Sequence, residues 1–363
     1  MADVRRTPLY EVQKKLGGQF IEFGGWEMSV QYTGIVDEHM AVRQNVGIFD
    51  VSHMSNLWVK GPDAAKLISK CTMYNPDKLK IGQAKYSAFP RDDATIIDDT
   101  IFMKFEDGFF VVPNAGMNEI VTKWLQEQAK RFGFNVEVKD HSKDFAIIAV
   151  QGPKAEALMQ NFVGMDITKT LFGKFKCAKT KVCGVDAILS RTGYTGEDGF
   201  EINLSPKDAE MAFMKIFEKG KEYGIRACGL GCRDTLRLEK AMMLAGHEFH
   251  GGRTPIEAGI DWAASWDHDF LGKDVMENQK ASGQFAHLVG IKMLSKGIPR
   301  NEYEIQKNGK KIGTITSGSV SPILKVGIAM GYVPAEFAKV GEKVDIIIRG
   351  KPEAAEIVKM PFL

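Results

Sequence analysis

A thirteen-residue segment, 190–202, concentrates polar chemistry in this chain. It reads SRTGYTGEDGFEI, so it carries a phenol, three glycines and the carboxylates of Glu197, Asp198 and Glu201. Glycine permits positive φ and a close approach of backbones, and the carboxylates can accept hydrogen bonds from an amine-rich heterocycle. We interpret the segment as a ligand-facing hairpin. The alternative is an ordinary acidic turn, because D-G sequences are common turn chemistry.

Two adjacent carboxylates, Asp98 and Asp99, stand inside an otherwise apolar run. Side chains alternate between the two faces of a strand, so we expect one of the pair to face solvent and the other to face inward. An inward carboxylate has a desolvation cost and therefore needs a partner or a task. The pair is a candidate catalytic feature, and the alternative is an aspartate that caps a loop at a strand edge.

Two arginines, Arg233 and Arg237, lie four residues apart in the sequence GLGCRDTLRLE. This spacing places them on one face of a helix. They predict either a fork that binds a substrate carboxylate or a salt-bridged surface. His53, in FDVSHMS, is a possible general base, although a lone histidine after a strand is more often structural.

The elements that must position these residues alternate between helices and strands. We expect a first helix over 7–16 with Thr7 as its N-cap and Pro8 in its first turn, and a strand pair over 95–105 and 109–112. The turns Gly61-Pro62 and Gly152-Pro153 are each followed by an amphipathic helix and a strand pair, which indicates two related α+β halves. Further helices are expected over 34–45, 118–132, 154–162 and 206–223, and further strands over 55–60, 144–150, 185–190 and 199–204.

The pattern changes near residue 282, where short strands separated by turns begin. Such a pattern predicts an all-β barrel or sandwich, and Asn308-Gly309 is a strong hairpin signal within it. We therefore divide the chain into an α+β region, 1–281, and a C-terminal β domain, 282–363.

Composition excludes several classes of function. The 363 residues carry a net charge of +2 with 26% charged residues, so nucleic acid and membrane surfaces are not expected partners. Five cysteines show no C-x-x-C and no metal-ligand spacing, which indicates free thiols and no metal site. No signal core or long apolar run is present, so we expect a cytoplasmic protein. Glycine-rich nucleotide motifs are also missing.

Several long motifs, in order along the chain, resemble the T protein of the glycine cleavage system, the aminomethyltransferase family. They cover most of the chain from Arg6 to Phe362. The motifs are FGGWEMSVQYTGIVDEHMAVRQNVGIFDVSHM (23–54), the Asp98-Asp99 strand, SRTGYTGEDGFEI (190–202), RDTLRLEKAM (233–242), DFLGK (269–273) and TSGSVSP (316–322).

The resemblance implies a fold, an activity and a set of site residues. The fold would be α+β, a three-domain cloverleaf with two interleaved α+β domains and a C-terminal barrel-like domain. The activity would be transfer of an aminomethyl group from the lipoyl arm of H protein to tetrahydrofolate, with release of ammonia, formation of 5,10-methylenetetrahydrofolate and no metal. Asp99 would be catalytic, and the folate-binding residues would be Met54, Asn114, Tyr194, Glu201, Arg233 and Trp262.

Some positions depart from the family pattern, and they leave the identity of the one-carbon donor open. Ala94-Thr95 stand where G-G is usual, Pro113 displaces Asn114 by one residue, and Ala245 replaces a tyrosine. A second hypothesis is therefore a tetrahydrofolate-dependent demethylase acting on a small N-, O- or S-methyl compound. A third is a folate-binding accessory protein without turnover, but the K-G-C-Y motif of such relatives is replaced here by residues 239–246, EKAMMLAG.

Overall fold

The computed structural model describes residues 4–363, and it divides into two compact units. The first unit holds the chain up to residue 71 together with 75–87 and 100–233, and the second holds 72–74, 88–99 and 234–363. Within residues 4–363 no helix combines the length and apolar character needed to span a bilayer. The helices are α1 (Tyr10–Lys15), α2 (Ile35–Gln44), α3 (Ala64–Cys71), α4 (Asn118–Arg131), α5 (Ala155–Met159), α6 (Pro206–Gly220), α7 (Leu230–Glu239), α8 (Ala245–Glu248) and α9 (Lys273–Ser282).

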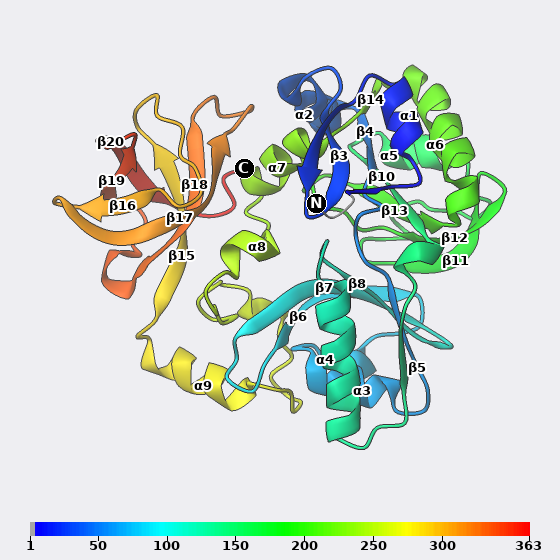
Figure 1. Cartoon of the computed structure of the whole chain (residues 1–363), viewed down its shortest axis with the longest axis horizontal. Helices are drawn as coiled ribbons and strands as arrows, with labels where there is room; N and C mark the ends of the chain where they lie inside the picture. The colour runs from blue at the N-terminus through cyan, green and yellow to red at the C-terminus, as the bar shows by residue number, and fades with distance from the viewer. Residues whose placement is uncertain (1–3) are drawn as a thin grey trace. The chain divides into compact units, whose positions relative to one another are not determined.

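A six-stranded sheet in the first unit carries the SRTGYTGEDGFEI segment. Its order is β11-β12-β13-β10-β4-β14, and α1, α5 and α6 pack against it around one apolar core (Figure 1). The core forms because inward residues alternate along β13 and recur at helical spacing along α6, as at Phe213 and Ile216. The strands are β4 (Val46–Asp50), β10 (Ala146–Gln151), β11 (Cys177–Val182), β12 (Val185–Ser190), β13 (Gly199–Leu204) and β14 (Ile225–Ala227).

A five-stranded sheet, in the order β6-β7-β8-β5-β9, carries the aspartate pair. The predicted hairpin is confirmed, and Phe105 pairs with Gly108 at its turn. The expectation that one aspartate faces solvent is wrong, since Asp98 is 0% and Asp99 8% exposed. β7 is an interior strand whose Ile96 and Ile97 are buried as well, so both of its faces are covered here. The strands are β5 (Leu57–Lys60), β6 (Gln83–Pro90), β7 (Ile96–Phe105), β8 (Gly108–Pro113) and β9 (Glu137–Asp140).

The N-terminal helix is shorter than predicted. α1 begins at Tyr10 with Leu9 at the N-cap position, and Thr7 does not cap it. The Thr7 hydroxyl instead donates a hydrogen bond to Asp50 at the end of β4, over 2.5 Å, so a long-range contact replaces the local cap. Beside α1 lies a small sheet of β1 (Arg5–Arg6), β3 (Trp26–Gln31) and β2 (Gln19–Phe23).

The predicted C-terminal barrel is confirmed. Six strands close in the order β15-β18-β17-β16-β19-β20 (Figure 1). The hairpin at Asn308-Gly309 has φ values of 52° and 72°, as a turn with two left-handed central residues requires. The strands are β15 (Ala286–Met293), β16 (Glu304–Lys307), β17 (Lys310–Val320), β18 (Gly327–Pro334), β19 (Lys343–Ile348) and β20 (Lys351–Val358).

Candidate active site

Asp198, one of the three carboxylates in the segment, supports the structure of its loop. The guanidinium of Arg191 donates to Asp198 from Nε over 2.8 Å, and the same group binds Glu156 over 2.6 Å. The Arg191 side chain is 1% exposed. Burial alone would raise the pKa of Asp198, but the hydrogen bond and charge of Arg191 outweigh it and hold the pKa below its usual value. Asp198 therefore fixes the loop between β12 and β13.

Glu197 also forms an ion pair with an arginine, whereas Glu201 does so with no residue between 4 and 363. Arg43 of α2 donates to Glu197 over 2.9 Å and to the Thr195 carbonyl over 2.6 Å. Glu201 is half-buried in β13 and accepts a hydrogen bond of 2.5 Å from the Thr192 hydroxyl. In the part of the chain that the structure describes, it is the carboxylate of this segment that forms no salt bridge.

The glycines of the segment serve two purposes. Gly196 has φ of 80°, the left-handed region that favours glycine. A Cβ at Gly193 would lie 1.9 Å from Oε1 of Gln151. The Gln151 amide donates to the Thr192 carbonyl over 3.1 Å and accepts from the Thr195 hydroxyl over 2.9 Å. Gln151, which the sequence did not single out, therefore holds the loop against β10.

Arg233, in the first turns of α7, lies over the ring of Tyr194 with 4.7 Å between its Cζ and the ring centroid. This is the geometry of a cation–π contact. Burial lowers the pKa of the Arg233 guanidinium, and the negative charge of Glu201 opposes that effect. The structure thus brings together three predicted residues. Arg233 supplies a cation, Tyr194 an aromatic face and Glu201 a carboxylate.

Ser55, the residue after Met54, is hydrogen-bonded to Asn114. The Ser55 hydroxyl donates to the Asn114 carbonyl over 3.3 Å, and its amide donates to the Pro113 carbonyl over 3.3 Å. Met54, next in the chain, is half-buried in the loop after β4. This loop and the end of β8 are therefore joined.

His53, beside Met54, does not have the properties of a general base. Burial, followed by the charge of Arg233, lowers the pKa of His53 to about 3. The ring is therefore neutral at physiological pH and a weak proton acceptor. Its buried Nδ1 makes no hydrogen bond to any residue between 4 and 363.

The proposed arginine fork is wrong for Arg237. Its side chain is 1% exposed and makes salt bridges of 3.3 Å to Glu248 and 2.7 Å to Asp234. It also donates to the Ser317 hydroxyl over 2.9 Å. Helical spacing placed the two arginines on one face, but Arg237 is bound by Glu248 of α8 and Ser317 of β17 as well as by Asp234 of its own helix.

The last two predicted site residues, Asp99 and Trp262, belong to the second unit. Asp99 is buried in β7, directly before Thr100, which pairs with Pro113 of β8. Trp262 lies in the short helix Asp261–Ala263, and the residue is 67% exposed.

One cluster with metal-ligand side chains was not expected from the sequence. Glu38, Cys228 and Cys232 are buried with their ligand atoms within 4.8 Å of one another. The Glu38 carboxylate is already occupied by backbone amides, from residues 32, 33 and 34 on one oxygen and from Gly229 on the other. Burial raises the pKa of the Cys232 thiol well above its usual value. The hydrogen bonds of Glu38 therefore join the segment 32–34 to the start of α7.

Comparison with known proteins agrees with this architecture. A family model described as the GCVT N-terminal domain matches residues 9–268, and one described as the glycine cleavage T-protein C-terminal barrel domain matches 287–363. A curated aminomethyltransferase of Desulfitobacterium hafniense strain DSM 10664 / DCB-2 is 41% identical over 100% of this chain and 99% of its own. One from Porphyromonas gingivalis strain ATCC 33277 is 42% identical over 99% of each. A crystal structure of glycine cleavage system aminomethyltransferase T from Bartonella henselae is 32% identical with a TM-score of 0.90, covering 99% of this chain and 98% of that one.

These matches define the class of protein by its fold, which is a mixed α+β region followed by a six-stranded barrel. The chain belongs to the glycine cleavage T-protein family. It is an enzyme, an aminomethyltransferase of the glycine cleavage system. Membership implies use of tetrahydrofolate and association with the H protein of that system.

Proposed function

We propose that the enzyme takes the aminomethyl group from the lipoyl arm of H protein and transfers its carbon to tetrahydrofolate, which forms 5,10-methylenetetrahydrofolate, releases ammonia and leaves the lipoyl arm as its free dithiol. The observation that carries the proposal is the cluster of Glu201, Arg233 and Tyr194. It combines a carboxylate that forms no salt bridge within residues 4–363 with a cation and an aromatic face. These groups match the donors, acceptors and flat ring of a reduced pterin.

Glu201 would orient the pterin through its 2-amino-pyrimidine edge. A carboxylate can accept two parallel hydrogen bonds from such an edge, which fixes direction as well as position. Thr192 already donates to one oxygen of Glu201, over 2.5 Å, so the carboxylate is held before the ligand arrives. Met54 and Tyr194 would contact the faces of the ring, as methionine and aromatic side chains do with flat heterocycles. We assign Asn114 and Trp262 to folate binding as well.

Asp99 would act at the one-carbon unit. The travelling carbon passes through a cationic, iminium-like species as ammonia leaves, and a carboxylate held away from water stabilises that charge and can accept or return a proton. Asp99 is 8% exposed, so the charge of its carboxylate would be little screened. The chemistry we propose for these residues needs no bound metal.

The donor is tested by reconstitution. Purified enzyme is mixed with tetrahydrofolate and aminomethylated H protein, and ammonia and methylenetetrahydrofolate are measured. We expect equal amounts of both products, and none when H protein carries no lipoyl group. An enzyme that binds tetrahydrofolate but gives neither product would overturn the carrier proposal. Demethylation of a small methylamine in the same assay would support the demethylase alternative instead.

A further inference from the structure

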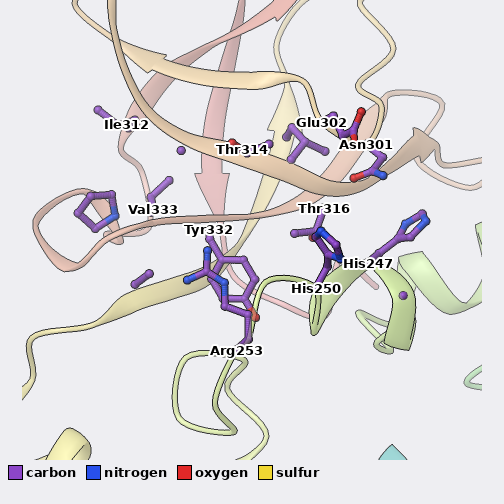
Figure 2. Close-up of a pocket in the computed structure, with 15 residues that line it drawn as sticks. His247, His250, Arg253, Asn301, Glu302, Ile312, Thr314, Thr316, Tyr332 and Val333 are labelled. Carbon is purple, nitrogen blue, oxygen red and sulfur yellow. The ribbon is translucent and has the colours of Figure 1, made fainter. Parts of the chain in front are cut away.

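A cavity of about 420 Å³ lies in the second unit, between the barrel and the segment that contains α8. Its walls come from residues 246–253, from β17 and from β18 (Figure 2). This volume is within the range of small-molecule sites. None of its lining residues takes part in the folate site proposed above.

The wall formed by α8 is rigid because a buried glutamate fixes it. Glu248 is 0% exposed and accepts hydrogen bonds from the Leu244 amide over 2.8 Å and from the Thr316 hydroxyl of β17 over 2.6 Å. Its own carbonyl accepts from the Tyr332 hydroxyl of β18 over 2.8 Å. A cavity with walls joined in this way exists before a ligand binds.

Hydrogen-bond donors gather on one side of the cavity. Figure 2 shows His247, His250 and Arg253 extending from the α8 segment, with Arg253 beside the Tyr332 ring. The Arg253 Cζ lies 4.1 Å from the centroid of that ring. Burial raises the pKa of the Tyr332 phenol, so this ring brings no negative charge to the cavity.

One edge of the Arg253 guanidinium lacks an acceptor. Nη1 donates to Glu257 over 3.0 Å. In the described part of the chain Nε is buried without a hydrogen-bond partner, and Nη2 donates to no acceptor. A shielded donor without an acceptor carries a desolvation cost. The Nε–Nη2 edge is also the fork that binds a carboxylate through two parallel hydrogen bonds.

The barrel side of the cavity is mixed, because apolar side chains lie there together with Asn301, Glu302 and Thr314. Ile312 and Val333 lie there, away from the imidazoles and the guanidinium (Figure 2), and Ala286 of β15 also lines the space. A ligand that fits both sides has an anionic head and a short hydrocarbon tail.

We propose that this cavity is a second binding site, which takes a small aliphatic carboxylic acid as its anion. The carboxylate binds the Nε–Nη2 edge of Arg253 with His247 or His250 as a further donor, and the hydrocarbon part packs against Ile312 and Val333. The site is independent of the folate chemistry, so its failure would leave the proposed function unchanged.

The test uses butyrate as the probe on the full-length enzyme, by isothermal titration calorimetry and by ligand-observed NMR. For a ligand of this size we expect a Kd on the order of 1 mM. Butyramide has the same shape without the negative charge, and butylamine carries a positive charge on a chain of the same carbon number. We expect each to bind at least about tenfold more weakly.

Two variants locate the site. Arg253→Lys keeps the positive charge but removes the fork, and we expect the Kd for butyrate to rise about tenfold or more. Ala286→Leu fills the barrel side and should also weaken binding, without changing any charge. The matched control is Arg349→Lys in the exposed turn of the same barrel, which should bind butyrate like the wild type.

Three results would overturn the proposal. They are no saturable binding of butyrate, equal binding of butyramide, and unchanged affinity in both Arg253→Lys and Ala286→Leu. Thermal melting of each variant separates lost binding from lost folding. Should Arg253→Lys fail to fold, the Nε–H resonance of Arg253 in the wild type decides, because butyrate at this edge must shift it while butylamine must not.

Discussion

Glu201 differs from its neighbours Glu197 and Asp198 in the partner that binds its carboxylate. Both neighbours form ion pairs with arginines whose side chains are 7% and 1% exposed, Arg43 and Arg191. Glu201 is held by the hydroxyl of Thr192. An ion pair occupies a carboxylate, whereas a single hydroxyl leaves most of its acceptor capacity open. At the scale of residues, this difference is the reason we propose Glu201, among three similar side chains, as the ligand-binding group.

The Glu201→Gln variant tests that selection. Glutamine keeps the shape but replaces one acceptor by a donor, so it cannot accept both hydrogen bonds from a 2-amino-pyrimidine edge. We expect the Kd for tetrahydrofolate, measured by calorimetry, to rise about tenfold or more. Glu210→Gln, at an exposed surface ion pair with Lys15, is the control and should leave the Kd unchanged. Equal affinity in Glu201→Gln would remove this residue from the site.

The Asp99→Asn variant tests the proposed catalytic carboxylate. The amide has nearly the same volume but cannot carry the charge that stabilises a cationic carbon. We expect turnover to fall by at least about a hundredfold, while the Kd for tetrahydrofolate changes little. Asp92→Asn, on the exposed turn before β7, is the matched control. Near-normal turnover in Asp99→Asn would refute the mechanism.

At the scale of elements, the loop between β12 and β13 is held by β10 through Gln151. Gly193→Ala should therefore destabilise the protein by about 1–3 kcal/mol, because its methyl group must displace the Gln151 amide. Urea denaturation measures the loss. Gly164→Ala is the control, since a Cβ there would meet no atom within 4 Å and its φ is not positive. A Gly193→Ala protein as stable as the control would show that the loop accommodates the methyl group without losing its contacts to Gln151, which would contradict the prediction.

The same loop contributes a pH-dependent part of the stability. The pKa of Asp198 is lower in the folded protein than its ordinary value, so the folded state favours the ionised form. This stabilisation is present above about pH 4 and is lost as the pH falls through the folded pKa. Asp198→Asn should lower the unfolding free energy at pH 7 by about 1 kcal/mol and flatten its decline in acid. In Asp186→Asn, whose side chain is 92% exposed, the acid decline should match the wild type.

At the scale of the whole molecule, ligand binding should stabilise the fold. Any ligand that binds only the folded state raises the unfolding free energy, by about 2.7 kcal/mol at a hundred times its Kd. We therefore expect tetrahydrofolate to raise the melting temperature in a concentration-dependent manner, measured by scanning fluorimetry. Glu201→Gln should show a smaller rise at equal ligand concentration. No rise at saturating ligand would argue against folate as a substrate.

Local sequence determined most elements of this protein. β12, β13 and the Asn308-Gly309 hairpin lie where alternation and turn residues predicted them, because strand period and left-handed turn positions depend on neighbouring residues. The long motifs were sufficient to indicate the family. The division of the chain at residue 282 stays a prediction.

Only the tertiary structure decided which polar groups are already used. Asp98 is buried together with Asp99 because both faces of β7 are covered at this point. Arg237 is bound to Glu248 and Ser317, and Asp198 is bound to Arg191. These partners are 7 to 80 residues away along the chain. A salt bridge or a covered strand face is a property of neighbours in space, and packing, rather than residue type, distinguishes Glu201 from its ion-paired neighbours Glu197 and Asp198.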